Sequence, residues 1–133
     1  MAKILLIDDD DPLRAIMCET LKHFGHMVVE ARNGKEGMEL FEQTRMDLVI
    51  TDIVMPEKEG LEVLMELRKQ PKPVKVIAIS GGGSTGKVEY LHIAKLMGAS
   101  AVLAKPFSLI ALMTAVDELL AGDDAPGSRA SVA

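Results

Sequence analysis

Side chains that could do chemistry follow four short apolar runs of this sequence. They are two adjacent carboxylates, a single carboxylate, a hydroxyl and an ammonium group: Asp8 and Asp9, Asp52, Ser80, and Lys105. Carboxylate oxygens are ligands that Mg²⁺ prefers in proteins, and an aspartate can accept a phosphoryl group as an acyl phosphate. A lysine and a hydroxyl can neutralise and orient the incoming anion. If the fold brings these groups together, they suit phosphoryl transfer.

Apolar runs alternate with helical patterns along the chain, which is typical of βαβ units and a parallel sheet. The apolar runs predict five strands, at residues 4–7, 27–29, 48–51, 74–79 and 101–104. The intervening patterns predict five helices: one capped by Asp11 and ended by Gly25, one opened by Asn33-Gly34, one started near Gly60 and ended by Pro71 and Pro73, one at 87–97, and one at 109–121 capped by Ser108. A chain of 133 residues suits one such domain. We therefore predict an α/β fold, a doubly wound five-stranded parallel sheet with helices on both faces.

Helical spacing also predicts which apolar side chains face the core. They lie on the first three predicted helices: Leu13, Met17, Leu21 and Phe24; Met38 and Phe41; Leu61, Leu64, Met65 and Leu67. The nine methionines of the chain are assigned mainly to such core and helix contacts.

The strand order decides whether the reactive side chains meet. Right-handed crossovers leave only a few possible orders. In the order 2-1-3-4-5 the first and third strands are neighbours, about 4.8 Å apart, so Asp8, Asp9 and Asp52 converge at the carboxyl edge of the sheet. Like charges so close together repel, and a cation or shared protons must relieve the repulsion. Ser80 and Lys105 then face the same edge from the other side.

Composition and charge exclude several classes of protein. Apolar residues make up 48% of the chain, which indicates a globular protein, and a net charge of −5 argues against binding nucleic acid. The single cysteine, Cys18, excludes an intramolecular disulfide and fits a reducing compartment. A strand predicted almost at the N-terminus leaves no room for a signal peptide, and no apolar run approaches the length of a membrane span. We therefore expect a soluble, cytoplasmic protein.

The reactive residues and their joint spacing resemble the receiver domain of bacterial two-component response regulators. The resemblance rests on Ile-Asp8-Asp9, Asp52-Ile-Val-Met-Pro56, Ser80, Gly98-Ala99 and Lys105-Pro106-Phe107, and it covers residues 3–121. It implies a flavodoxin-like sheet in the order 2-1-3-4-5. It further implies a receiver domain at residues 1–122, which leaves residues 123–133 as a mobile C-terminal tail.

The resemblance also implies the roles of individual residues. Asp52 would be the phosphoacceptor, taking a phosphoryl group from a sensor histidine kinase or a histidine phosphotransfer protein. Asp9 and Asp52 would bind Mg²⁺ directly together with the backbone carbonyl of Val54, and Asp8 would act through water. Such a chain is not an enzyme in the ordinary sense, since it catalyses only its own phosphorylation and dephosphorylation.

On the other side of the site, Ser80 and Lys105 would bind the phosphoryl oxygens, and the bond between Lys105 and Pro106 would be cis. The family usually binds its downstream protein through the fourth helix, fifth strand and fifth helix, here 87–97, 101–104 and 109–121. We expect neither direct nucleic-acid binding nor membrane insertion.

Two features depart from the common receiver pattern. Val102 stands where receivers usually carry an aromatic residue, so the usual aromatic switch is absent and output must rest on the Ser80 loop, the fourth helix, or both. Val54 and Gly82 offer no side-chain group to orient an attacking water.

Two other functions stay open at this point. The segment Gly81–Lys87 fits the nucleotide-loop pattern G-x-x-x-x-G-K, but Val88 replaces the Ser or Thr that would bind Mg²⁺. A flexible loop beside Ser80 is therefore preferred over a nucleotide site. The other alternative is a pseudo-receiver, a protein-binding module that is never phosphorylated, against which the complete set of reactive residues argues.

Overall fold

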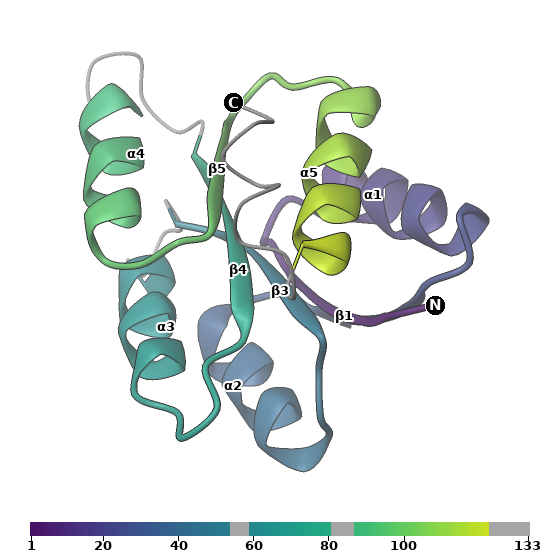
Figure 1. Cartoon of the computed structure of the whole chain (residues 1–133). Helices are drawn as coiled ribbons and strands as arrows, with labels where there is room; N and C mark the ends of the chain where they lie inside the picture. The colour runs from purple at the N-terminus through teal and green to yellow at the C-terminus, as the bar shows by residue number, and fades with distance from the viewer. Residues whose placement is uncertain (54–58, 81–86, 123–133) are drawn as a thin grey trace.

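The computed structural model describes residues 1–53, 59–80 and 87–122 of the chain. In the described residues, strands and helices alternate from the N-terminus to the C-terminal helix (Figure 1). The elements are β1 (Lys3–Ile7), α1 (Asp11–His23), β2 (Met27–Ala31), α2 (Gly34–Gln43), β3 (Leu48–Asp52), α3 (Glu59–Arg68), β4 (Lys75–Ser80), α4 (Lys87–Leu96), β5 (Ala101–Ala104) and α5 (Leu109–Ala121).

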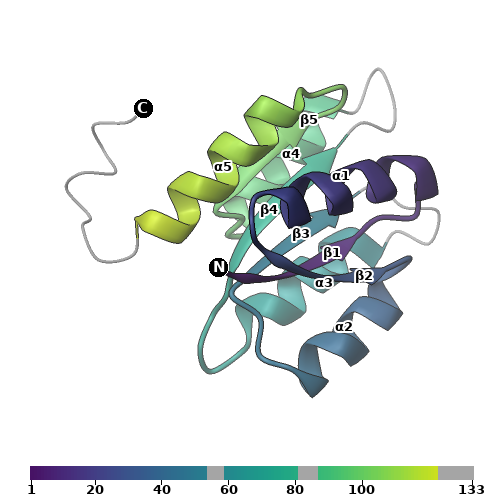
Figure 2. The same cartoon turned by 90° about the vertical axis from the view of Figure 1, so that its right-hand side faces the viewer.

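The strands form one parallel sheet in the order β2-β1-β3-β4-β5, which confirms the predicted order. Helices α1 and α5 cover one face of the sheet, and α2, α3 and α4 cover the other (Figure 1 and Figure 2). Successive strand residues point to opposite faces, so β1 sends Leu5 and Ile7 into one core and Ile4 and Leu6 into the other. All four side chains are fully buried, as expected of a central strand covered on both faces.

The pairing register aligns the carboxyl ends of the central strands. The paired residues at this edge are Ile7 and Thr51, Asp52 and Ile79, and Ser80 and Ala104. Asp52 and Ser80 were predicted to follow their strands, but they are the last residues of β3 and β4. The ladder is made by backbone groups whatever the side chain. Both polar residues are therefore held within the sheet itself.

The N-cap of α1 differs from the prediction by one residue. The side chain of Asp10 accepts a hydrogen bond from the amide three residues later at 3.1 Å, so the cap is Asp10 and the prediction of Asp11 is wrong. Asp11 instead lies in the first turn, 2.8 Å from Nη2 of Arg14. Every Asp of the acidic run can cap a helix, so the sequence does not select one of them. The cap predicted at Ser108 is confirmed by the same bond to the amide three residues later. Asn33, which was predicted to open the second helix, caps α2 in the same way.

The core-facing predictions are confirmed except at Phe24 and Met65, which are 59% and 47% exposed. Phe24 is the C-cap of α1 and lies beyond its last turn, where the chain reverses at Gly25 with a φ of 94°. On α3 the buried stripe runs through Leu64 and Leu67. Met65 falls outside this stripe because a helix advances about 100° per residue.

Helix α5 has the predicted bounds and packs on the sheet, with Leu112 and Val116 fully buried. Among the described residues, no helix combines the length and the apolar character needed to span a bilayer. The tail predicted to be mobile, 123–133, lies outside the described residues.

Candidate functional site

Backbone hydrogen bonds extend beyond three strand ends and fix the carboxyl edge of the sheet. They run from the amide of Asp8 to the carbonyl of Ala31 (3.1 Å), from Ile53 to Ile79 (2.8 Å), and from Lys105 to Ser80 (2.8 Å). In each bond, the residue that directly follows one strand donates to a carbonyl of the neighbouring strand. The reactive side chains therefore stand on a fixed backbone, which is what a precise site needs.

Three carboxylates gather at this edge, as the sequence predicted. Asp8, Asp9 and Asp52 each offer an oxygen that lies within 4.8 Å of the others. Asp8 and Asp52 are buried, whereas Asp9 is exposed. The cluster is thus half inside the protein and open to solvent at Asp9.

The buried member of the cluster, Asp8, is perturbed. Burial raises the pKa of Asp8 to about 6, and the charges of Asp52 and Asp9 act in the same direction. A hydrogen bond from the amide of Asp10, 2.9 Å from Oδ1, and the charge of Lys105 oppose this rise in pKa. Ionised Asp8 is therefore held at a cost, which a bound cation would relieve.

The chemistry of the cluster fits a hard divalent cation. Oδ2 of Asp8 is buried and accepts no hydrogen bond from any described residue. A buried carboxylate oxygen without a donor is costly, and Mg²⁺ takes such oxygens together with water. Asp9, at the exposed side, leaves room for the waters that Mg²⁺ retains.

Lys105 supplies the positive charge of the site. Its Nζ lies 2.9 Å from Oδ2 of Asp52 and 3.6 Å from Oδ2 of Asp8. Burial lowers the pKa of Lys105, but the hydrogen bond and charge of Asp52 and the charge of Asp8 outweigh it, so its pKa is raised. The lysine is therefore an ammonium ion at neutral pH. The bond from Lys105 to Pro106 is cis, which confirms the sequence prediction.

Ser80 brings a hydroxyl to the same edge from the strand next to β3. Its side chain is fully buried, and its Oγ has no hydrogen-bond partner among the described residues. Buried hydroxyls are normally satisfied. A hydroxyl left without a partner at the mouth of a polar site is suited to bind a ligand oxygen.

The remaining predicted positions are described only in part. Val54, Gly82 and the loop at 81–86 lie outside the described residues. Val102 lies on β5 and packs, partly buried, against the core beneath α2, α3 and α4. Its side chain is confined to that core and carries no ring to move.

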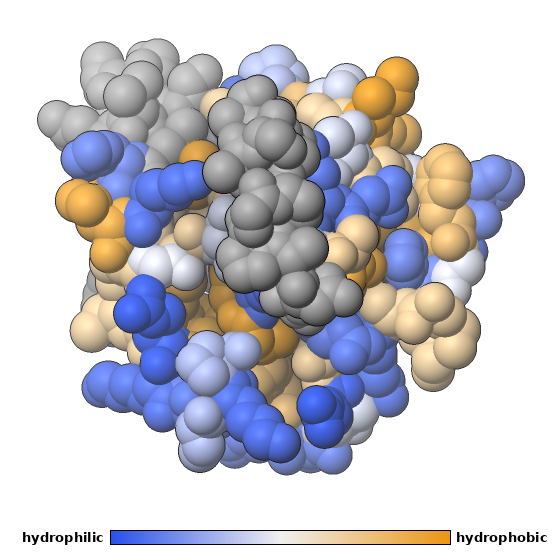
Figure 3. Space-filling view, in the orientation of Figure 1, coloured by the Kyte–Doolittle hydropathy of each residue, from blue (hydrophilic) through white to orange (hydrophobic). Residues whose placement is uncertain are grey.

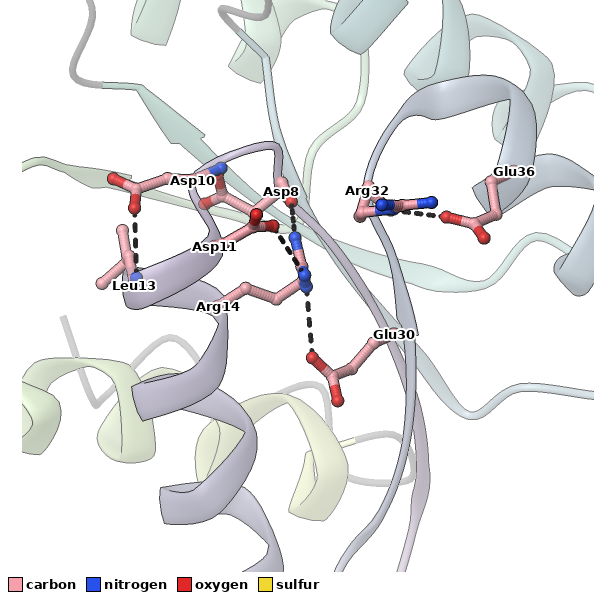
Figure 4. Close-up of polar contacts among 8 residues, drawn as sticks. All are labelled: Asp8, Asp10, Asp11, Leu13, Arg14, Glu30, Arg32 and Glu36. Atoms are coloured by element: carbon pink, nitrogen blue, oxygen red, sulfur yellow. Dashed lines mark hydrogen bonds and ion pairs between the residues drawn. The ribbon is translucent and has the colours of Figure 1, made fainter.

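Arg14 was missed by the sequence analysis. It reaches from α1 to the carbonyl of Asp8, to Asp11 and to Glu30 of β2 (Figure 4). The three-residue spacing of Asp11 and Arg14 on a helix was a usable signal for one of these contacts. The contacts with Asp8 and Glu30 depend on how β1, α1 and β2 pack.

The family model for the response regulator receiver domain matches residues 4–117. The chain belongs to this family. This receiver domain is 33% identical to the chemotaxis protein CheY of Halobacterium salinarum, over 90% of the chain and 98% of that protein. It is 37% identical to the sensor kinase CckA of Brucella abortus over 92% of the chain, but this region is only 13% of CckA. Receiver domains thus occur in these relatives both alone and within much longer proteins.

Solved structures show the same fold. A response regulator receiver domain protein from Clostridium thermocellum superposes with a TM-score of 0.81 at 30% identity, over 90% of this receiver and 94% of that chain. The chemotaxis response regulator CheY4 of Vibrio cholerae superposes with a TM-score of 0.79 at 29% identity, over 90% of this receiver and 99% of that chain. The flavodoxin-like prediction is confirmed, and the comparisons favour a receiver in a two-component system over a nucleotide-binding protein.

Proposed function

We propose that Asp52 is the phosphoacceptor of this receiver and that it takes its phosphoryl group from a phosphohistidine on a kinase or phosphotransfer protein. One observation carries the proposal: Asp52 ends a central strand with Lys105 at 2.9 Å and two further carboxylates within 4.8 Å. A carboxylate oxygen of Asp52 attacks phosphorus while the bond from phosphorus to the donor nitrogen breaks. The imidazole keeps the electron pair and takes a proton from solvent.

Asp9 and Asp52 would bind Mg²⁺ together with the carbonyl predicted at Val54, and Asp8 would act on the cation through water. The cation would neutralise charge on the phosphoryl oxygens when bound. Lys105 already sits between Asp52 and Asp8, and it transfers its contact to a phosphoryl oxygen as that group arrives. The hydroxyl of Ser80, which has no partner among the described residues, donates to another phosphoryl oxygen.

Output passes to a protein partner through α4, β5 and α5. This face carries exposed apolar side chains at Leu96 (73%) and Ile110 (79%), and Ile93 is 39% exposed. In Figure 3 hydrophobic and hydrophilic residues are interspersed over the part of the described surface that is visible in this view. The receiver domain spans 1–122, acts in the cytoplasm, and catalyses only its own phosphoryl transfer. With a net charge of −5 it does not bind nucleic acid directly.

Intact-mass analysis after incubation with acetyl phosphate and Mg²⁺ tests the proposal. The full chain should gain one phosphoryl group, and Asp52→Asn should gain none. Asp117→Asn, the same chemical change on the exposed side of α5, should behave as the wild type. Phosphorylation of Asp52→Asn to the same extent would contradict the assignment. Absence of both phosphorylation and Mg²⁺ binding in the wild type would identify a pseudo-receiver instead.

A further inference from the structure

Arg14 joins three segments around the acidic edge while its side chain is only 12% exposed. Its Nη1 donates to the carbonyl of Asp8 at 2.7 Å, its Nε donates to Oε1 of Glu30 at 3.1 Å, and its Nη2 lies 2.8 Å from Oδ1 of Asp11 (Figure 4). All three guanidinium nitrogens therefore have a partner, and the plane of the group is fixed by β2, by α1 and by the end of β1.

The contact with Asp8 falls where the chain leaves the sheet. The amide of Asp8 is bound to the carbonyl of Ala31 at 3.1 Å, and Arg14 binds the carbonyl on its other side. Oδ1 of Asp8 accepts from the amide of Asp10 at 2.9 Å. With backbone and Oδ1 held, the remaining oxygen, Oδ2, is the one that has no hydrogen-bond donor in the described residues.

The two positively charged side chains near the acidic cluster, Lys105 and Arg14, contact different kinds of group. Lys105 contacts carboxylate oxygens of the cluster. Arg14 contacts a backbone carbonyl, and its charge is balanced by Asp11 and Glu30, which lie outside the cluster. Arg14 thus anchors the loop without occupying an oxygen that a metal ion would use.

We propose that Arg14 is a positioning residue for the divalent cation. It fixes the carbonyl of Asp8 and so determines where the carboxylates of Asp8 and Asp9 stand. The inference rests on the proposed function, because it concerns the affinity of the Mg²⁺ site described there. A planar guanidinium can hold three partners in fixed directions, which a lysine ammonium on a flexible stem does not reproduce.

Calorimetric titration of Mg²⁺ into the full chain and its Arg14→Met and Arg14→Lys variants tests this inference. A residue that acted only through its charge would, once removed, tighten cation binding, because a nearby positive charge repels Mg²⁺. We expect the opposite. Partners that orient metal ligands typically contribute about 10- to 100-fold in affinity, so Arg14→Met should weaken Mg²⁺ binding by about that factor. Arg14→Lys should also bind more weakly than the wild type.

A second readout is amide hydrogen exchange of Asp10 in the metal-free protein. It should be faster in Arg14→Met, because the bond to Oδ1 of Asp8 is no longer held in place. Arg45→Met removes the same charge from an exposed position just before β3, at the opposite end of that strand from Asp52, and should leave both readouts unchanged. Urea unfolding confirms that each variant is folded at the titration temperature.

Tighter or unchanged Mg²⁺ binding in Arg14→Met would overturn the inference, as would wild-type affinity in Arg14→Lys. If the wild type binds Mg²⁺ and is phosphorylated while the variants match it, the inference fails and the proposed function stands. If the wild type itself does not bind Mg²⁺, the cation site and this inference fail together.

Discussion

Replacing Asp8 by Asn should make the metal-free protein more stable at neutral pH, although it removes a residue of the functional site. Asp8 has an ordinary pKa of 3.8 and a folded-state pKa of about 6. The folded protein therefore binds this proton more tightly than the unfolded chain does. The favourable contribution is complete below the unfolded value and is lost as pH rises through the folded value. Above pH 6 the ionised carboxylate destabilises the fold.

The magnitude follows from the shift in pKa. A rise of about 2 units at about 1.4 kcal/mol per unit is worth about 3 kcal/mol, and the side chain of Asp8 is fully buried, so solvent does not screen it. About 2 kcal/mol of this should develop between roughly pH 4.5 and pH 7.5. Asn keeps an oxygen that can accept the hydrogen bond from the amide of Asp10. The substitution therefore removes the negative charge and preserves the local structure.

Urea unfolding in the presence of EDTA, at several pH values across this range, measures the effect. The free energy of unfolding of Asp8→Asn minus that of the wild type should increase with pH by about 2 kcal/mol. Saturating Mg²⁺ should reduce the difference at pH 7.5, because the cation stabilises only the protein that binds it well. If the difference in free energy of unfolding is constant with pH, or falls as pH rises, then ionised Asp8 is not what destabilises the fold. Asp117→Asn serves as the control and should follow the wild type.

Two further substitutions test the local structure. Ser80→Ala should leave the free energy of unfolding unchanged or raise it by up to about 1 kcal/mol, because it deletes a buried hydroxyl without a partner among the described residues. Urea unfolding measures this change. A loss of more than about 1 kcal/mol would indicate that Ser80 forms a hydrogen bond in the unphosphorylated protein. Asp10→Ala should cost about 1 kcal/mol as the loss of an N-cap. Asp11→Ala should cost less than half of that, because Asp11 is 68% exposed and forms a surface ion pair; the reverse order of the two losses would place the cap at Asp11.

The sheet and the convergence of its reactive residues could be predicted because the signals are local and consistent. Each apolar run is bounded by polar residues, and the strand ends of a parallel sheet must share an edge. The positions of the strand ends were predicted less accurately. Asp52 and Ser80 look like loop residues by type, yet the backbone ladder with the neighbouring strands includes them. Backbone pairing depends on both strands together, so the sequence of one strand does not predict where the pairing ends.

Other features depended on packing that a single sequence does not display. On α3 the sequence analysis assigned Met65 to the core face, but this side chain is 47% exposed, and only the packing of the helix on the sheet shows which side of Leu64 is covered. Arg14 shows the same limit at the site. Its partner Glu30 lies on β2, 16 residues away in sequence, and becomes a neighbour only when α1 packs against the sheet.

The ion pair between Lys105 and Asp52 joins strands that are not neighbours. Lys105 follows β5, Asp52 ends β3, and β4 lies between them. In the described sheet β5 is an edge strand, paired on one side only, so the lysine gives it a second attachment at the centre of the sheet. The side chain of Asp52 therefore contacts, across β4, the residue that directly follows the outermost strand.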